Sequence, residues 1–239
     1  MAGRSLAHKS RGLWITLLIL AAIGLEIYSG SESHHDTTSS RHSPTRAETP
    51  ETAGQSKPAP GSEKSGGYEL YRRCTLVDVR NNDGDSFMVQ LPGGKQAVFR
   101  LYFVDTPESA FRRYAGGETN YERIRQQAAE MGGITPEQAV EIGKQGKHFT
   151  LGLLAGHPFD IYTRWDSPFN DNRFHAHLAV MQDGKPRWLD ELLIERGLAR
   201  IKTKPADLPD GTPAAKHLAR LKDLERAAKR AEIGAWSLK

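Results

Sequence analysis

Three short apolar runs joined by tight turns constrain the fold of this chain most strongly. The runs cover residues 71–79, 86–91 and 96–104 and have the alternating apolar pattern of β-strands. Asn81–Asp85 and Pro92–Gly94 have the composition of turns. Strands joined by so few residues pair with their sequence neighbours, so the runs predict an antiparallel meander.

Helices and further strands are expected after the meander. Residues 121–131 predict a short helix, and Thr135 with Pro136 predicts the start of a longer helix that ends near Leu154. The other expected elements are strands at 158–164, 174–181 and 188–189, a helix at 190–197, an extended segment at 198–202 and a helix at 213–232. The order βββ-α-ββ-α-α predicts a mainly β fold with α-helices, an OB-type five-stranded β-barrel with about three packed helices.

The chain before the meander has a different composition. Residues 1–30 carry basic residues before an apolar run at 12–25, which predicts a cleaved signal peptide or an uncleaved membrane anchor through residues 12–28. Residues 31–67 are rich in Ser, Thr, Pro, Glu and Gly and predict a disordered linker. We therefore expect one folded domain at 68–239, located outside the cytoplasm as a secreted, periplasmic or membrane-anchored protein.

A single cysteine excludes several classes of protein. Cys74 has no second cysteine with which to form an intramolecular disulfide, a cysteine-based zinc finger or a CxxC redox centre. Any metal must therefore be bound by oxygen or histidine ligands. The net charge of +4 is compatible with a nucleic-acid partner but is too small to indicate one.

The meander carries a group of residues suited to phosphodiester chemistry. Asp85 ends the first turn, Arg100 interrupts an apolar run, and Asp105–Glu108 follow that run. Carboxylates on two hairpin-linked segments can bind one hard cation such as Ca²⁺. A buried arginine requires a partner or a function, and a phosphodiester could be bound by the cation and the arginine together.

Four sequence strings carry a family resemblance. They are, in chain order, CTLVDVRNNDGDSF, FRLYFVDTPES, WLDELLIERGLARI and the terminal GAWS. Together they resemble the staphylococcal nuclease, or thermonuclease, family over about residues 73–238. The resemblance implies an OB barrel with three helices and Ca²⁺-dependent hydrolysis of phosphodiester bonds in DNA and RNA.

The same resemblance implies roles for individual residues. Asp85 and Asp105 are similar to the carboxylate calcium ligands of the family, together with the backbone carbonyl of Thr106. Glu108 is similar to the general base that acts on the attacking water. Arg100 is similar to one of two arginines that bind the phosphate and stabilise its developing charge.

The second arginine has two possible positions. An alignment on Leu178–Ala179 places Ala176 at this position and predicts an inactive protein. An alignment on Arg173 keeps the arginine and lengthens the following hairpin by two residues on each arm, which preserves the face of every side chain. We therefore expect Arg173, with Arg164 and the nearby histidines as alternatives. His175 and His177 share one strand face and are expected to form a surface pair.

Two segments depart from the family. Residues 109–134 are longer than the corresponding loop and form either a substrate rim or a solvated insertion; their arginines are Arg112, Arg113, Arg123 and Arg125. Residues 202–204 (Lys-Thr-Lys) replace base-stacking aromatics, which predicts electrostatic contact with phosphate instead. The leading expectation is a monomeric Ca²⁺-dependent nuclease whose substrate is DNA, RNA or both. The alternative is a weak or inactive nuclease-like module that binds nucleic acid or protein.

Overall fold

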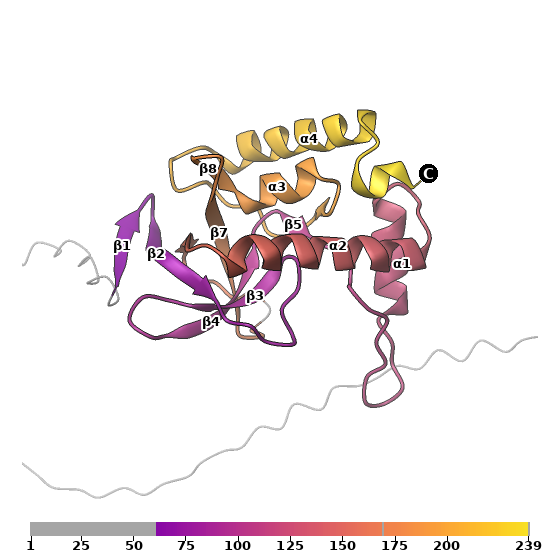
Figure 1. The fold of residues 1–239 in the computed structure, drawn as a ribbon, viewed down its shortest axis with the longest axis horizontal. Coiled ribbons are helices and arrows are strands. Elements are labelled where there is room, and N and C mark those ends of the chain that lie inside the picture. The colour runs from indigo at the N-terminus through magenta and orange to yellow at the C-terminus, as the bar shows by residue number, and fades with distance from the viewer. Residues whose placement is uncertain (1–60, 169, 239) are drawn as a thin grey trace, which may run out of the picture. The chain divides into compact units, whose positions relative to one another are not determined.

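A small β-barrel forms the centre of the fold, which a computed structural model describes for residues 61–168 and 170–238 (Figure 1). Its five strands are, in order around the barrel, β2 (Tyr68–Leu76), β3 (Ser86–Gln90), β4 (Gln96–Leu101), β7 (Arg173–Gln182) and β6 (Phe159–Thr163). β2 also pairs with β6, which closes the barrel. The expected OB-type barrel with packed helices is thereby confirmed. The expected signal or anchor segment lies outside the described residues.

The predicted meander forms the first half of the barrel. β2, β3 and β4 pair antiparallel in chain order, and Phe87 and Val89 of β3 point into the core. β4 then pairs parallel with β7. A parallel pair needs a long crossover, and here residues 106–158 with two helices supply its first part.

Four short strands complete the sheets. They are β1 (Ser62–Ser65), β5 (Val104–Asp105), β8 (Lys185–Trp188) and β9 (Arg200–Ile201). β1 pairs with β2 through a turn at Gly66 and Gly67, both at positive φ, so the expectation of a linker is wrong for residues 62–67. The strand expected at 188–189 begins earlier, at Lys185, and ends at Trp188.

The prediction of one continuous strand over residues 96–104 is wrong. β4 ends at Leu101, and Phe103 has a φ of +66°, a left-handed conformation outside the β region. The chain bends there and continues as β5, which pairs with β9 instead of β7. This bend separates Asp105 from the barrel strand that carries Arg100.

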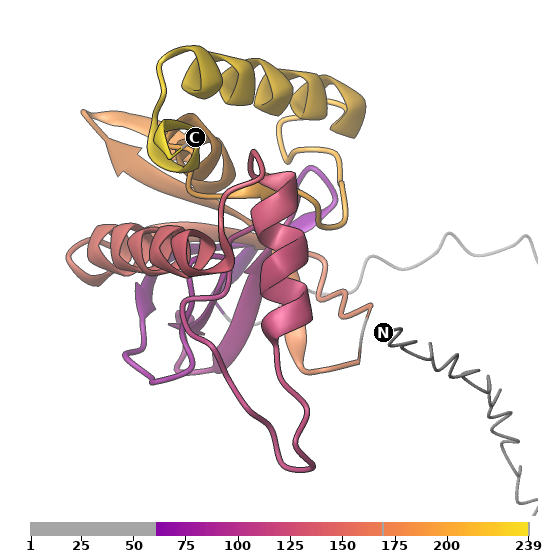
Figure 2. The same ribbon diagram turned by 90° about the vertical axis from the view of Figure 1, so that its right-hand side faces the viewer.

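Four α-helices cover the barrel (Figure 2). They are α1 (Tyr121–Glu130), α2 (Pro136–Ala155), α3 (Leu189–Glu195) and α4 (Ala214–Arg230), followed by the 3₁₀-helix η1 (Gly234–Ser237). α2 begins as expected, because Thr135 caps it and forms a reciprocal capping box with Gln138. α1 packs on α2, and α3 packs on α4. Among the described residues, no helix combines the length and apolar character needed to span a membrane.

His175 and His177 are buried, at 2% and 4% exposure, so the expected surface pair is wrong. Their rings lie 5.2 and 4.7 Å from the ring of Tyr102. Burial lowers the pKa of His177 to about 4. Both side chains therefore belong to the core, as does the buried Cys74.

Two glycines of α2 allow this helix to approach the segment that follows β5. A β-carbon at Gly143 would lie 2.5 Å from the carbonyl oxygens of both Pro107 and Glu108, and one at Gly146 would lie 3.5 Å from Thr106. On the same helix, the Thr150 hydroxyl donates a 2.8 Å hydrogen bond to the Gly84 carbonyl. α2 therefore packs directly against residues 106–108 and fixes the position of this segment.

Gly143→Ala is expected to lower the free energy of unfolding by about 1–3 kcal/mol, because the added methyl overpacks against backbone atoms that cannot rotate away. Urea unfolding measures this change. Gly152→Ala is the control in the same helix, since nothing lies within 4 Å of its added carbon. It should stabilise the chain by up to about 1 kcal/mol through helix propensity. Equal stability of the two variants would contradict the close approach of α2.

Candidate functional site

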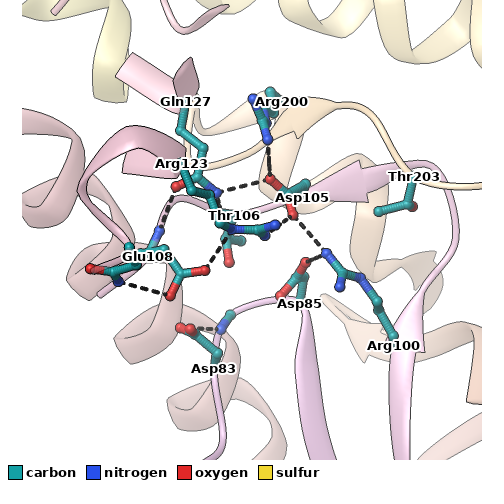
Figure 3. Close-up of polar contacts among 12 residues, drawn as sticks. Asp83, Asp85, Arg100, Asp105, Thr106, Glu108, Arg123, Gln127, Arg200 and Thr203 are labelled. Carbon is teal, nitrogen blue, oxygen red and sulfur yellow. Dashed lines mark hydrogen bonds and ion pairs between the residues drawn. The ribbon is translucent and has the colours of Figure 1, made fainter. Parts of the chain in front are cut away.

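Asp105 lies at the centre of a network of three arginines (Figure 3). Its Oδ1 accepts hydrogen bonds from Arg100 Nη2 at 2.7 Å and Arg123 Nη2 at 2.9 Å. Its Oδ2 accepts from Arg200 Nε at 2.9 Å and Gln127 Nε2 at 3.0 Å. Burial by itself raises the pKa of Asp105, but Arg123, Gln127 and the other two arginines outweigh it and hold the pKa below its usual range.

The bend at Phe103 creates this arrangement. Beyond it, Asp105 of β5 pairs with Arg200 of β9, so these two residues are both strand neighbours and an ion pair. Arg200 Nη1 also contacts Glu130 of α1 at 2.9 Å. The short β5–β9 sheet therefore links the end of the meander to α1.

Asp85 has much less positive charge around it. Its Oδ2 lies 3.2 Å from Arg100 Nη2, its one ion pair within the described part of the chain. Burial raises the pKa of Asp85 to about 7; Arg100 opposes the shift, while Asp105 and Asp83 add to it. Asp85 is therefore a buried carboxyl group whose charge is incompletely compensated.

Glu108 lies at the solvent side of the network, with 20% of its side chain exposed. Its Oε1 accepts a 2.7 Å hydrogen bond from Arg123 Nε. Its backbone N–H donates to Gln127 Oε1 at 3.0 Å, and the amide of Gln127 donates to the Thr106 carbonyl at 3.1 Å. Two residues of α1 thus orient the whole Asp105–Glu108 segment.

A cleft of about 670 Å³ opens over these groups. Its polar lining includes Asp85, Arg100, Glu108, Arg112, Arg123 and Arg173. Of this lining, the sequence motifs indicated Asp85 and Arg100 in the meander and Glu108 after it. The structure thus brings Asp85, Arg100, Glu108 and Arg173 to one cleft, and Asp105 pairs with two arginines of its lining, Arg100 and Arg123.

The strand register distinguishes the two positions considered for the second arginine. In the parallel β4–β7 pair, Val98 is the partner of Arg173, so Arg173 lies on the same sheet face as Val98 and Arg100. Ala176 is the partner of Leu101 and faces the opposite, buried side. Arg173 is 40% exposed and pairs with Asp171 through a 2.8 Å hydrogen bond. An arginine at 176 would point into the core.

The other candidates for the second arginine lie elsewhere. The guanidinium of Arg164 lies 4.1 Å from the centre of the Tyr68 ring and lines a different hollow. His175 is buried, and neither of its ring nitrogens has a hydrogen-bond partner in the described structure. No known protein-family model matches the chain, and no curated protein matches it.

The residues expected to bind a cation, Asp85, Asp105 and Thr106, offer oxygen atoms of the kind that Ca²⁺ binds. Asp85 Oδ2 and Asp105 Oδ1 approach the same nitrogen, Arg100 Nη2, at 3.2 and 2.7 Å, so the two carboxylates converge. The described part of the chain contains no group of three or more His, Cys, Asp or Glu side chains that could hold a metal ion. The expected set has two carboxylates and the Thr106 carbonyl, which with water is a donor set that Ca²⁺ accepts. The incompletely compensated charge of Asp85 fits such a cation.

No role is expected from the sequence for Gln127 or Arg200, and Arg123 is expected only within an insertion that forms either a substrate rim or a solvated loop. Gln127 is fully buried on the face of α1 that also buries Ile124 and Ala128. A glutamine among apolar helix positions is the one local signal of its role. Arg200 lies within the WLDELLIERGLARI string, but the resemblance assigns it no role.

The segment at residues 202–204 is partly occupied by contacts within the protein. Lys202 pairs with Glu130 at 3.1 Å, and Lys204 pairs with Asp166 at 2.6 Å. Both lysines are about half exposed, at 46% and 49%, so solvent weakens these pairs. Contact of these lysines with phosphate stays a prediction.

Proposed function

We propose that this chain is a Ca²⁺-dependent nuclease of the staphylococcal nuclease type, which hydrolyses phosphodiester bonds in DNA, RNA or both. One observation carries the proposal: Asp85, Arg100, Glu108 and Arg173, from separate parts of the chain, line the same cleft. The apolar run at residues 12–25 and the polar segment after it support a location outside the cytoplasm, secreted or membrane-anchored.

The two arginines bind the phosphate in this mechanism. Arg100 and Arg173 lie on one sheet face, where their guanidinium groups can contact oxygens of the same phosphate. The buried Arg100 Nε has no hydrogen-bond partner in the described structure, so it has a free donor for such an oxygen. Charge that develops on the phosphate is stabilised by donors that are already in position.

Glu108 accepts the proton of the attacking water. Its carboxylate reaches solvent, and Arg123 and the Gln127 contact to its backbone hold it at the cleft wall. Asp85, Asp105 and the Thr106 carbonyl would hold the Ca²⁺ ion. When bound, this ion supplies positive charge for the phosphate and lowers the pKa of a water molecule.

One observation favours the alternative, a module that binds nucleic acid without cleaving it. Asp105 is already contacted by three arginines and one amide, so a cation that uses its oxygens competes with Arg100 and Arg123. These ion pairs hold the site together by themselves, so the protein can fold and bind an anion there without a metal ion.

A cleavage assay with the full-length chain distinguishes these functions. We expect fluorescent single-stranded DNA and RNA to be cleaved with CaCl₂, and cleavage to stop with EGTA. Asp85→Asn should reduce cleavage strongly. Asp223→Asn, an exposed carboxylate on α4, is the control and should cleave as the wild type does. Cleavage that survives EGTA and Asp85→Asn would refute the proposal, and binding without any cleavage would support the alternative.

A further inference from the structure

A second hollow, of about 800 Å³, lies beside the candidate site between α2 and residues 109–112 of the insertion. We call it the α2 cleft. Asn81 and Arg112 line both the α2 cleft and the cleft that contains Arg100 and Glu108. The two hollows are therefore neighbours, and a ligand strand bound at the candidate site can extend toward the α2 cleft.

The α2 cleft is basic. Lys144, Lys147, His148 and Leu151 occupy one face of α2 at helical spacing, and Arg80 and Arg112 face them from the loops. Its lining within the described residues includes no carboxylate. Two acidic residues interact with its cations: Glu141 pairs with Lys144 at 3.2 Å between exposed side chains, and the charge of Asp83 interacts with Lys147 and Arg112.

Most of this positive charge is available to a ligand. The side chains of Arg80, Arg112 and His148 form no salt bridge within the described residues, and Lys147 contacts only the Arg80 carbonyl at 3.5 Å. The exposed Lys144–Glu141 pair contributes little and dissociates readily. The cleft therefore suits a polyanion better than a neutral ligand.

The insertion carries exposed aromatic rings, one of which lines the α2 cleft. Phe111, Tyr114 and Tyr121, all in the insertion, are 47%, 50% and 47% exposed, and among the described residues no other Phe, Tyr or Trp side chain is as exposed. Phe111 lines the α2 cleft and stacks on Tyr121, with ring centres 6.0 Å apart. Tyr114 lines the cleft of the candidate site. Rings beside cations are the arrangement on which unpaired bases stack.

The insertion has a defined shape that presents these rings. Figure 2 shows residues 109–120 as a narrow loop that projects beyond α1. The buried Asn120 side chain joins its two arms: it accepts a 2.7 Å hydrogen bond from the Arg112 N–H and donates a 2.9 Å bond to the Ala110 carbonyl. Arg113 and Thr119 form a β-bridge further out.

We propose that the α2 cleft binds a single-stranded segment of nucleic acid next to the bond that is cleaved. Its phosphates contact Lys144, Lys147 and Arg112, and a base stacks on Phe111. Double-stranded nucleic acid is disfavoured, because a paired base cannot offer its face to the ring. This inference rests on the proposed function for the position of the cleaved bond, but binding in the cleft can be measured without cleavage.

The test measures binding of a fluorescent single-stranded 12-nucleotide DNA to the full-length chain in EGTA by anisotropy. For a single strand, each phosphate contact adds about 0.7 to the slope of log K against log salt concentration, so Lys144→Gln/Lys147→Gln should reduce this slope by about 1.4. Lys216→Gln/Lys222→Gln on α4 removes the same charge and should leave the slope unchanged. Phe111→Ala should weaken binding about tenfold and Phe111→Trp should preserve it.

The outcomes separate this inference from the proposed function. Hydrolysis of bis(4-nitrophenyl) phosphate by the wild-type chain tests the candidate site alone. If it fails while the salt slope changes as expected, the α2 cleft stands without the nuclease. If both lysine double variants bind the DNA equally, the inference is wrong. It is also wrong if Lys144→Gln/Lys147→Gln loses binding only to phosphatidylglycerol vesicles, since the partner is then a membrane surface.

Discussion

Glu108→Gln is expected to lower kcat for cleavage of single-stranded DNA by about 10²–10⁴-fold, because an amide cannot accept the proton of the attacking water. The substitution keeps the shape of the side chain, and its oxygen can still accept the 2.7 Å hydrogen bond from Arg123. The side chain is also partly exposed, so the fold should tolerate the change. Initial rates at saturating DNA and Ca²⁺ measure kcat, and thermal unfolding shows whether the variant is folded.

Glu122→Gln is the matched control. Glu122 lies on α1, is 76% exposed and pairs with Arg125, and it does not line the candidate site. The kcat of the Glu122→Gln variant should equal that of the wild type. A Glu108→Gln variant that keeps more than a tenth of the wild-type kcat would mean that another group accepts the proton.

Arg100→Gln is expected to lower kcat/KM by about 10²–10³-fold, the usual effect of removing one donor that stabilises developing charge. At a pH above the raised pKa of Asp85, it should also destabilise the fold by about 3–5 kcal/mol, because it removes the partner of a buried carboxylate. Asp85 loses its ion-pair partner, whereas Asp105 keeps its ion pairs with Arg123 and Arg200. Urea unfolding and kcat/KM measure the two effects separately.

A second substitution isolates the structural effect. Asp85→Asn combined with Arg100→Gln removes the unpaired charge, so the double variant should recover much of the lost stability. Arg125→Gln, which breaks an exposed pair on α1, should change stability by less than about 0.5 kcal/mol. Near wild-type kcat/KM in folded Arg100→Gln would remove Arg100 from the mechanism. A double variant no more stable than Arg100→Gln would mean that the Asp85 charge is not the source of the instability.

The sequence predicts the regular parts of the fold and misses the irregular ones for physical reasons. The meander and the capped α2 follow from local patterns, alternation of apolar residues in the first and the Thr135–Gln138 box in the second. β1 is polar, SEKS, and forms because it pairs with the edge of β2. The bend at Phe103 has no local signal, because a phenylalanine disfavours positive φ and only tertiary packing holds it there.

The candidate site shows the same division. Asp85 and Arg100 reach one cleft because a tight hairpin fixes their relative positions, and Glu108 joins them through contacts with α1. Gln127 and Arg200 could not be predicted, since α1 and β9 meet Asp105 only after the chain has folded. Contacts between distant segments are decided by packing, and no spacing within a motif encodes them.

The parallel pairing of β4 with β7 also has a consequence for the kinetics of folding. It joins Val98 to Arg173, and barrel closure joins Glu69 to Thr163, so both pairings connect residues far apart in the chain. The entropy of closing such loops is lost before the contacts stabilise them, which places barrels of this kind among slowly folding domains. Arg100 and Arg173 share a cleft only across this pair. A chain that has formed the meander alone therefore contains only Arg100 of the proposed phosphate-binding pair, and the pair is complete only when β4 has paired with β7.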